Sequence, residues 1–574
     1  MPAAGWPRPM AKRLRPRKMN KEIASRSLSF PSSAWERRLS KLCFAVVHET
    51  KFMIRQPVMR WLPAILFGLA PWFAERPVNG QEPNGLAAAA AIQEAFIKAI
   101  ETAEKSVVSI SRDKRQAMIH QDNRIAFLGR ERGFDPADPN WVPNEFGAGV
   151  IIDKAGLILT NYHLVRGGPV EGKPDQKADQ TLYVRLSDRR GFAARIFAAD
   201  PRSDLAVLKI PVGDLPAFKL ENKTIPVRKG QFVIALGNPY AIARDGSASA
   251  TWGIVSNVSR QAMIESEAND PERARNETII HQLGTLIQLD ARLDLGTSGG
   301  ALLNLQGELI GMTTSLAAIV GYEKSAGFAI PFDDAMKRII NSLRQGKEVE
   351  YGFLGVQPGE ILPGQSVSPE FAPIAARIKR GAARIESVFP NLPAQRAGLS
   401  DRDVVLSVGD RQVYGRTDLV REIGLVPAGT LVRLTIFRPQ LGREIEVPVE
   451  VGKWPVVDEE SIIATIPLRD LWRGISYDYS TGRKRFFSIP THEPLQGVRI
   501  VEVRPGTQTA AKELQPGDLI TAVKGIPVRS PREFAEAVKK ENGRPVVLTV
   551  WTPSDRNSAG FDRISPGRQV EIKP

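Results

Sequence analysis

Short apolar runs separated by turn residues fill the middle of this 574-residue chain. They form two sets, at residues 147–210 and 232–330. Short strands at such regular spacing favour antiparallel barrels over parallel βαβ units. We therefore predict a mostly β fold built around barrels. The runs are AGVIID, GLILTNYHLV, TLYVRLSD, FAARIFAAD and DLAVLKI in the first set, and FVIALGNP, ATWGIVSNVSR, LIQLD, GALLNLQGELIGMTTSL and SAGFAIP in the second.

The last third of the chain repeats itself at an offset of 115 residues. Apolar positions recur in one register, and each copy continues into a helix. Because chance gives only two or three such matches, the number found indicates two copies of one module. The matched pairs are Val388 with Val503, Pro390 with Pro505, Leu399 with Leu514, Asp403 with Asp518, Val408 with Val523, and Val413 with Val528.

Two helices frame the strand-rich region. An alanine-rich segment at 86–105 has apolar residues four apart, and FDDAMKRIINSLRQG at 332–346 places its apolar residues on one face. We therefore expect a leader at 1–81, a strand-rich domain at 86–345, and the repeated modules at 352–453 and 466–574.

Most of the excess positive charge lies in the leader. The formal net charge is +15, and residues 1–81, with 15 Lys and Arg against 4 Asp and Glu, supply +11 of it. A basic arm can bind acidic partners such as nucleic acid. We favour a processed leader, because the apolar core WLPAILFGLAPWFA at 61–74 follows Arg55 and Arg60, as in a signal peptide. On this interpretation the working protein binds no nucleic acid.

The segment 61–74 contains two prolines and is short for a membrane span. Small residues at the −3 and −1 positions fit cleavage before Gln81. Because signal peptides lie at the extreme N-terminus, we expect synthesis to begin at Met53 or Met59. The alternative is an uncleaved anchor, which is the one way in which this chain would bind a membrane.

The only cysteine, Cys43, lies in the leader, so a mature chain has no disulfide and no thiol chemistry. Export without cysteine fits a bacterial envelope, and we predict a periplasmic or envelope location. The sequence shows no metal cluster, phosphate loop or nucleotide fingerprint. We expect neither a metal nor a cofactor.

Five histidines make the search for a general base short. His48 lies in the leader. We expect His120, His281 and His492 at the surface, because their surroundings are polar and contain no partner motif. His163 ends the apolar run LILTNYH, where a change from strand to turn can present a side chain in a cleft.

Asp204 and Ser298 complete a candidate catalytic site. Asp204 precedes the buried run DLAVLKI, where a carboxylate needs a hydrogen-bonding partner such as an imidazole N–H. Ser298 lies in LDLGTSGGALLN, with three glycines close by. Serine is a weak nucleophile until an oriented base takes its proton. We therefore predict a triad of His163, Asp204 and Ser298.

The glycines around Ser298 suit an oxyanion hole. Gly296 can adopt backbone angles that other residues resist. The backbone N–H groups of Gly296, Thr297 and Ser298 are the predicted donors, and losing one such donor typically costs about 3 kcal/mol of transition-state stabilisation. The chain order His, Asp, Ser is that of the chymotrypsin-like double barrel.

These motifs resemble those of the HtrA/Deg family of envelope serine proteases. The similar segments are TNYHLV at 160, DPRSDLAVLK at 200 and GTSGGAL at 296, with LGNPY, GIVS and GFAIP as further landmarks. The repeated modules resemble the two PDZ domains of that family, so the resemblance covers roughly residues 90–574. It implies a chymotrypsin-like double β-barrel protease domain followed by PDZ domain 1 and PDZ domain 2.

The resemblance also implies a function. Members of the family are ATP-independent endopeptidases that act on unfolded or damaged proteins in envelope quality control, assemble as homotrimers or larger cages, and bind peptide C-termini. A cleft that pairs with substrate backbone needs an extended peptide. By analogy we expect the substrate edge at 313–316, pocket walls at 294–297 and 315–327, and regulatory segments at 111–144 and 258–284.

The PDZ resemblance implies loops whose adjacent N–H groups hold a carboxylate. In the first module the loop is Gly352, Phe353, Leu354 and Gly355. In the second it contains Gly474 and Ile475, although a plain strand start explains WRGIS equally well.

Three residues depart from the family pattern. Tyr162 is bulky beside the histidine, Thr297 replaces an asparagine, and Asp294 brings a carboxylate near the oxyanion site, where we expect it to point outward. The alternative function is a PDZ scaffold or holdase chaperone whose protease core is weak or switched off.

Overall fold

A computed structural model describes most of the chain after residue 84, and all of the described residues belong to one compact unit that begins at Glu82. The predicted signal segment, His120 and His492 lie outside the described residues. The described ranges are 85–114, 145–172, 180–220, 223–238, 246–261, 279–314, 327–363, 369–456, 461–482, 496–507, 509, 512, 514–541, 543–552 and 567–574.

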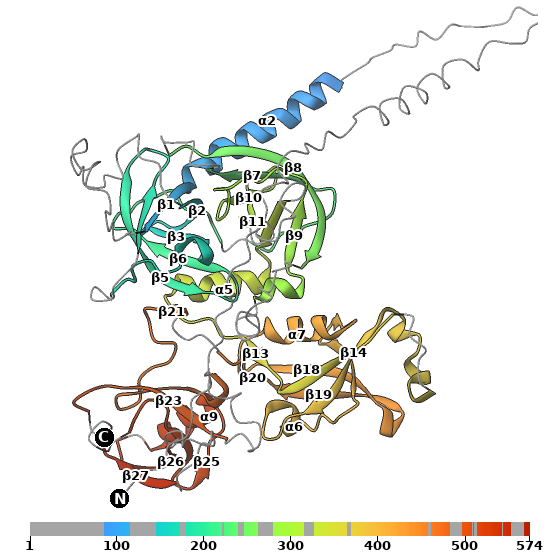
Figure 1. The fold of residues 1–574 in the computed structure, drawn as a ribbon, viewed down its shortest axis with the longest axis vertical. Coiled ribbons are helices and arrows are strands. Elements are labelled where there is room, and N and C mark those ends of the chain that lie inside the picture. The colour runs from blue at the N-terminus through green and yellow to red at the C-terminus, as the bar shows by residue number, and fades with distance from the viewer. Residues whose placement is uncertain are drawn as a thin grey trace, which may run out of the picture. The chain divides into compact units, whose positions relative to one another are not determined.

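The first set of strands forms an antiparallel barrel in the order β5-β4-β1-β2-β3-β6, closed because β5 pairs with both β4 and β6 (Figure 1). Its interior is filled by valine, leucine and isoleucine side chains. The strands are β1 (Val107–Lys114), β2 (Glu145–Asp153), β3 (Leu157–Asn161), β4 (Gln180–Arg185), β5 (Gly191–Asp200) and β6 (Leu205–Lys209).

The second set closes into another barrel, in the order β10-β11-β12-β9-β8-β7. The prediction of a chymotrypsin-like double barrel is therefore confirmed. A shared apolar core draws on strands of both barrels and on α5, so the two barrels pack on each other. The strands are β7 (Phe232–Gly237), β8 (Ser249–Arg260), β9 (Leu286–Leu289), β10 (Ala301–Leu303), β11 (Leu309–Thr314) and β12 (Gly327–Pro331).

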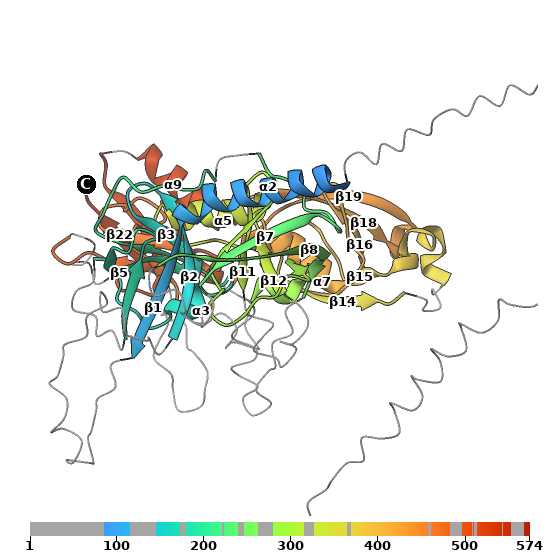
Figure 2. The ribbon, with the colours of Figure 1, turned by 90° about the horizontal axis from the view of Figure 1, so that it is seen from above.

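Both framing helices form as predicted. The first, α2, lies against β7 and β8, where the Phe96 ring packs on Phe232 and Trp252 (Figure 2). The second, α5, begins where the Asp333 side chain accepts a hydrogen bond from the Met336 N–H, a typical N-cap. The helical segments of this domain are α2 (Gly85–Ala103), η1 (Glu104–Ser106), α3 (Tyr162–Val165), η3 (Ile280–Leu283) and α5 (Asp334–Arg344).

The two C-terminal modules have the same topology, with sheet orders β14-β15-β16-β18-β19 and β22-β23-β24-β26-β27. The repeat predicted these correspondences, since β16, β17, α7 and β18 each begin 115 residues before β24, β25, α9 and β26. The first module contains β13 (Gly352–Phe353), β14 (Val356–Ile361), η5 (Pro369–Ile374), η6 (Arg377–Arg380), β15 (Ala382–Val388), α6 (Pro393–Arg396), β16 (Val404–Val408), β17 (Arg411–Gln412), α7 (Arg416–Gly424), β18 (Leu431–Arg438), η7 (Pro439–Leu441), β19 (Arg443–Glu450) and β20 (Gly452–Lys453). The second contains β22 (Ile475–Tyr479), η8 (Ser480–Gly482), β23 (Val498–Val503), β24 (Leu519–Val523), β25 (Ile526–Pro527), α9 (Pro531–Lys540), β26 (Val546–Trp551) and β27 (Arg568–Ile572).

One short strand between the modules belongs to the protease sheet. In β21 (Ile463–Ala464), Ile463 pairs with Ala199 and Ala464 with Ala198 of β5. The segment between the modules is therefore in part a strand of the first barrel and not a plain linker. Among the described residues, none of the helices has the length and apolar character needed to cross a membrane.

Candidate active site

The imidazole of His163 and the carboxylate of Asp204 are hydrogen-bonded. The ring Nδ1 lies 2.8 Å from Oδ2 and 3.0 Å from Oδ1 of Asp204. The backbone N–H of His163 donates to Oδ1 over 2.9 Å as well. Asp204 is only 2% exposed, and a buried carboxylate needs hydrogen-bond donors. Here the backbone and the ring of His163 supply them. This is the orienting contact that a catalytic histidine needs.

The sequence suggested that His163 ends a strand, but in the structure it does not. β3 stops at Asn161, and His163 lies in the one-turn helix α3. The turn begins where the Tyr162 N–H donates to the Asp204 carbonyl over 2.9 Å, and the Asn161 side chain reaches the same carbonyl. Backbone and side-chain bonds therefore fix the segment of His163 to the segment of Asp204.

Ser298 lies in the loop that precedes β10 of the second barrel, and it is 3% exposed. Its carbonyl accepts a hydrogen bond from the Ala148 N–H over 2.8 Å, and the Ala148 carbonyl accepts one from the Thr160 hydroxyl. Thr160 precedes His163 by three residues. The fold thus joins the serine loop to the β2–β3 hairpin that leads to the histidine.

The outer nitrogen of the histidine is not bonded to the serine in this structure. Nε2 of His163 is buried and has no hydrogen-bond partner. A general base needs a nitrogen that can accept the nucleophile's proton, and in substrate-free sites the bond between base and nucleophile is often long. Of the two contacts expected in the triad, the structure forms the His163–Asp204 contact.

The three residues of the predicted oxyanion hole differ in backbone geometry and hydrogen bonding. Gly296 adopts φ 95°, and a Cβ there would lie 2.4 Å from the Asn238 carbonyl oxygen. The Thr297 N–H donates to the Asp294 carbonyl over 3.1 Å, and the Thr297 hydroxyl donates to the same oxygen. A role for Thr297 in binding an oxyanion would require this turn to open, so the prediction rests on Gly296 and Ser298.

The structure also places Asp294 and Tyr162, the other two residues that depart from the family motif. The Asp294 carboxylate pairs with the Arg292 guanidinium, whose side chain is 84% exposed. Tyr162 is half-buried and packs against the core of the first barrel. The prediction that Thr313 lies at a free strand edge for substrate is wrong. Its backbone N–H donates to the Gly300 carbonyl, and its carbonyl accepts the Gly299 N–H. On the other side its strand, β11, pairs with β12.

The sequence did not single out Arg112, which supports the histidine segment from β1. Its guanidinium donates to the carbonyls of His163 and Arg166, over 3.4 and 3.2 Å, and pairs with Glu145. Burial, with the nearby charge of Arg166, lowers the pKa of Arg112 from its ordinary value. No motif marked it, because a single arginine at the end of the alternating run SVVSISR looks like a surface residue.

The expectation that His281 lies at the surface is wrong. It is 0% exposed, with Nε2 2.8 Å from the Ser203 carbonyl oxygen and Nδ1 2.6 Å from the Thr285 hydroxyl. Burial lowers the pKa of this imidazole. The ring is thus hydrogen-bonded to the residue that directly precedes Asp204.

The structure describes every residue of the predicted carboxylate loop of the first module. Gly352 and Phe353 form β13, Leu354 is buried, and Gly355 adopts φ 78°. The loop leads directly into β14 and lies beside α7, because a Cβ at Gly352 would meet the Ile423 carbonyl of that helix at 2.4 Å. A peptide C-terminus bound between β14 and α7 would end at this loop.

The corresponding loop in the second module is a closed turn. Ile475 N–H donates to the Trp472 carbonyl over 2.9 Å, and Trp472 N–H donates back to the Ile475 carbonyl over 3.0 Å. Gly474 is left-handed at φ 86°, and its carbonyl accepts the Arg504 N–H. The N–H of Ile475 thus already has a partner, which weakens the prediction that this loop holds a carboxylate.

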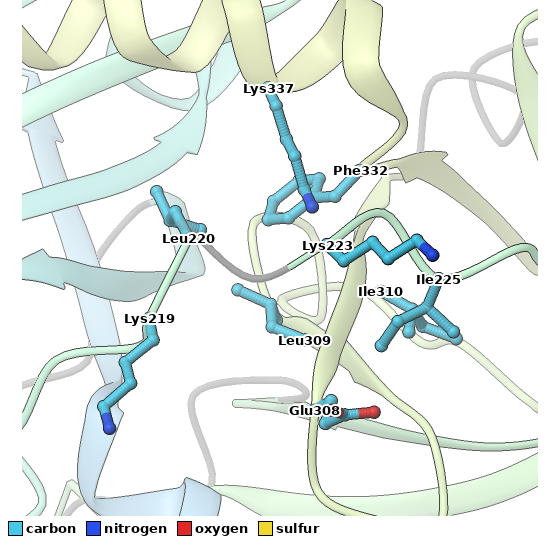
Figure 3. Close-up of a pocket in the computed structure, with 9 residues that line it drawn as sticks. All are labelled: Lys219, Leu220, Lys223, Ile225, Glu308, Leu309, Ile310, Phe332 and Lys337. Atoms are coloured by element: carbon cyan, nitrogen blue, oxygen red, sulfur yellow. The ribbon is translucent and has the colours of Figure 1, made fainter.

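A pocket elsewhere on the protease domain contains none of the triad residues (Figure 3). Lysine side chains surround its apolar floor, and Lys337 extends from α5 over Phe332. Within the described ranges, no group of His, Cys, Asp or Glu could hold a metal ion. The pocket is lined by Lys219, Leu220, Lys223, Ile225, Glu308, Leu309, Ile310, Phe332 and Lys337.

Comparisons with protein families agree with this layout. Residues 147–312 match the trypsin-like peptidase domain, and residues 352–449 and 499–552 each match a PDZ domain.

Individual relatives are similar over most of the chain. A probable periplasmic serine endoprotease DegP-like from Chlamydia trachomatis is 31% identical over 70% of this chain and 72% of its own length. The protein of the same description from Pseudomonas fluorescens is 32% identical over 68% of this chain and 74% of its own length. Among solved structures, the HtrA-type protease AlgW with tripeptide is 25% identical with a TM-score of 0.43, over 63% of this chain and 97% of that one.

Proposed function

This chain belongs to the HtrA/Deg family of serine endoproteases, and on that premise we propose that it cleaves unfolded or damaged proteins with the triad His163, Asp204 and Ser298. The observation that carries the proposal is the 2.8 Å contact between Nδ1 of His163 and the buried carboxylate of Asp204. That contact leaves Nε2, which has no hydrogen-bond partner, as the base for Ser298.

The proposed mechanism follows from these positions. Nε2 of His163 takes the proton of the Ser298 hydroxyl as its oxygen attacks the scissile carbonyl, and later gives a proton to the leaving amine. Asp204 holds the ring with Nδ1 protonated and stabilises the imidazolium that forms. The N–H groups of Gly296 and Ser298 bind the negative oxygen of the tetrahedral intermediate, which a preorganised site stabilises strongly.

The proposed substrates are extended polypeptides, since binding beside a strand requires an unfolded segment. The first PDZ module would capture peptide C-termini at the Gly352–Phe353 strand and the glycine that follows, and thereby regulate cleavage. The curated relatives are named periplasmic endoproteases, so we propose export to the periplasm and a role in protein quality control there. We also propose a homotrimer or larger assembly.

The proposal is tested with purified residues 81–574 and unfolded casein. The wild type should degrade casein and react with a fluorophosphonate probe, and Ser298→Ala should do neither, with kcat reduced by about 10⁴-fold or more. A matched control is Ser407→Ala, a buried serine of the first PDZ module, which should keep full activity. Equal casein degradation by wild type and Ser298→Ala would contradict the assigned nucleophile.

A PDZ scaffold or holdase is the second candidate, because a switched-off site would also leave Nε2 of His163 without a hydrogen-bond partner. It predicts suppression of casein aggregation without degradation. An absence of fluorophosphonate labelling in the wild type, even with unfolded substrate present, would support it over the protease.

A further inference from the structure

The backbone at Asp204 adopts an uncommon conformation. Asp204 has φ 51°, in the left-handed region that residues with a Cβ occupy at a cost of about 1–2 kcal/mol. It is the last residue of the four-residue turn 201–204 between β5 and β6, and its N–H reaches the Pro201 carbonyl over a long 3.3 Å. Other contacts must therefore hold this residue, and with it the carboxylate that orients His163.

A buried carboxylate holds the turn from one side. Oδ2 of Asp200 accepts the Ser203 N–H over 3.0 Å, the Ser203 hydroxyl over 2.5 Å, and the hydroxyl of Tyr351. Asp200 is 1% exposed and Tyr351 is 0% exposed. The Tyr351 ring also lies under the Arg202 guanidinium, with 5.2 Å between the guanidinium carbon and the ring centre. Tyr351 thus contacts Asp200, the last residue of β5, and Arg202 of the turn.

A buried histidine holds the same turn from the other side. The Ser203 carbonyl offers no proton, so Nε2 of His281 must donate to it; in the neutral ring Nδ1 then accepts from the Thr285 hydroxyl. The Ser203–Asp204 peptide is therefore fixed at its carbonyl by His281, while Asp200 fixes the Ser203 side chain. The hydrogen bond from His281 reaches the triad through this peptide.

Both supports come from segments tied to the first PDZ module. Tyr351 directly precedes β13, and its carbonyl accepts the Trp454 N–H over 2.7 Å. His281 lies in η3, where the Leu283 carbonyl accepts a hydrogen bond from Arg421 of α7 over 3.0 Å. The turn that carries Asp204 is thus held by residues from outside the first barrel.

We propose that Tyr351 and His281 are positioning residues for the protease reaction, which hold the Asp204 turn in its left-handed conformation through Asp200 and Ser203. The inference rests on the proposed triad and adds two residues to it that contact neither substrate nor reacting atoms. Their contribution is to kcat, because the orientation of the base matters in the chemical step and not in binding the peptide.

The test uses the purified protein, an unfolded casein substrate labelled with a fluorophore, and the fluorophosphonate probe. Tyr351→Phe keeps the ring and removes only the hydroxyl, and it should lower kcat and the rate of probe labelling about tenfold or more, with KM within about twofold. The matched control is Tyr414→Phe, a tyrosine of the first PDZ module that stacks on Arg380 and should leave both rates unchanged.

A second pair of variants separates positioning from folding. His281→Gln keeps an N–H donor for the Ser203 carbonyl and should retain most of the wild-type kcat, whereas His281→Leu should lose about as much as Tyr351→Phe. Equal kcat values for His281→Gln and His281→Leu, or a wild-type labelling rate in Tyr351→Phe, would overturn this inference alone. A wild type that neither labels nor cleaves would overturn the proposed function and this inference with it.

Discussion

At the scale of single residues, Gly296 links backbone shape to catalysis most directly. A Cβ there would lie 2.4 Å from the Asn238 carbonyl oxygen and 2.6 Å from the Phe146 ring, and φ is 95°. Gly296→Ala should therefore shift the loop and misdirect its N–H, with a fall in kcat on the order of 10²–10³-fold. The control is Gly398→Ala, which has φ 79° but open space around it and should keep wild-type kcat.

His281 makes stability depend on pH. Burial lowers the pKa of its imidazole from 6.5, so near and below that pH the unfolded chain binds a proton that the folded chain does not. The contribution of this residue is complete above the unfolded pKa and is lost as pH falls toward the folded value. The free energy of unfolding in urea should fall between pH 7.5 and pH 5.5, and fall less in His281→Gln. An identical pH dependence in both proteins would contradict this.

The residues of the site differ in how far the sequence could identify them. His163 and Asp204 were predictable because each ends or begins an apolar run, and the structure joins them at 2.8 Å. His281 was not, because its partners Ser203 and Thr285 come together only through the fold. Burial of a histidine in a polar stretch is a property of tertiary packing, which no local pattern records.

At the scale of elements, β21 gives the clearest prediction. Ile463 packs against the core of the first barrel and pairs with Ala199, so this short strand covers part of β5. Ile463→Asp should place a charge against that core, lower the free energy of unfolding by about 1–3 kcal/mol, and speed cleavage near residue 463 by added trypsin. The control is Ile466→Asp, since Ile466 is 44% exposed. Similar effects of both variants would argue against a specific role for β21.

The elements also show what a sequence can and cannot locate. The strands of the barrels were predictable from apolar runs, and the shared topology of the modules from the repeat, because both signals lie within short windows. β21 was not, since Ile463 and Ala464 become a strand only by pairing with β5. The short helix α3 was missed for a related reason: it depends on the Asp204 carbonyl, which accepts the N–H of Tyr162.

At the scale of the whole molecule, an exposed aromatic cluster among the described residues is suited to self-assembly. Phe96 of α2, Phe232 of β7 and Trp252 of β8 pack together with ring centres 5.5 to 6.2 Å apart. Yet Trp252 stays 62% exposed and Phe232 37% exposed. Large aromatic side chains gathered at a surface are typical of protein–protein interfaces. The proposed homotrimer or larger assembly is expected to bury them.

Trp252→Ser tests this interface. Removing the indole should leave the barrel intact, because most of its surface faces solvent, but it should lower the molar mass measured by light scattering coupled to size-exclusion chromatography. Leu431→Ser is the control, since Leu431 of β18 is 65% exposed and lies in the first PDZ module. A Trp252→Ser protein with the mass of the wild type, or a wild type that is monomeric at micromolar concentration, would contradict the assignment. If the mass falls while probe labelling of Ser298 persists, each protomer holds a complete site, as expected when His163, Asp204 and Ser298 all come from one chain.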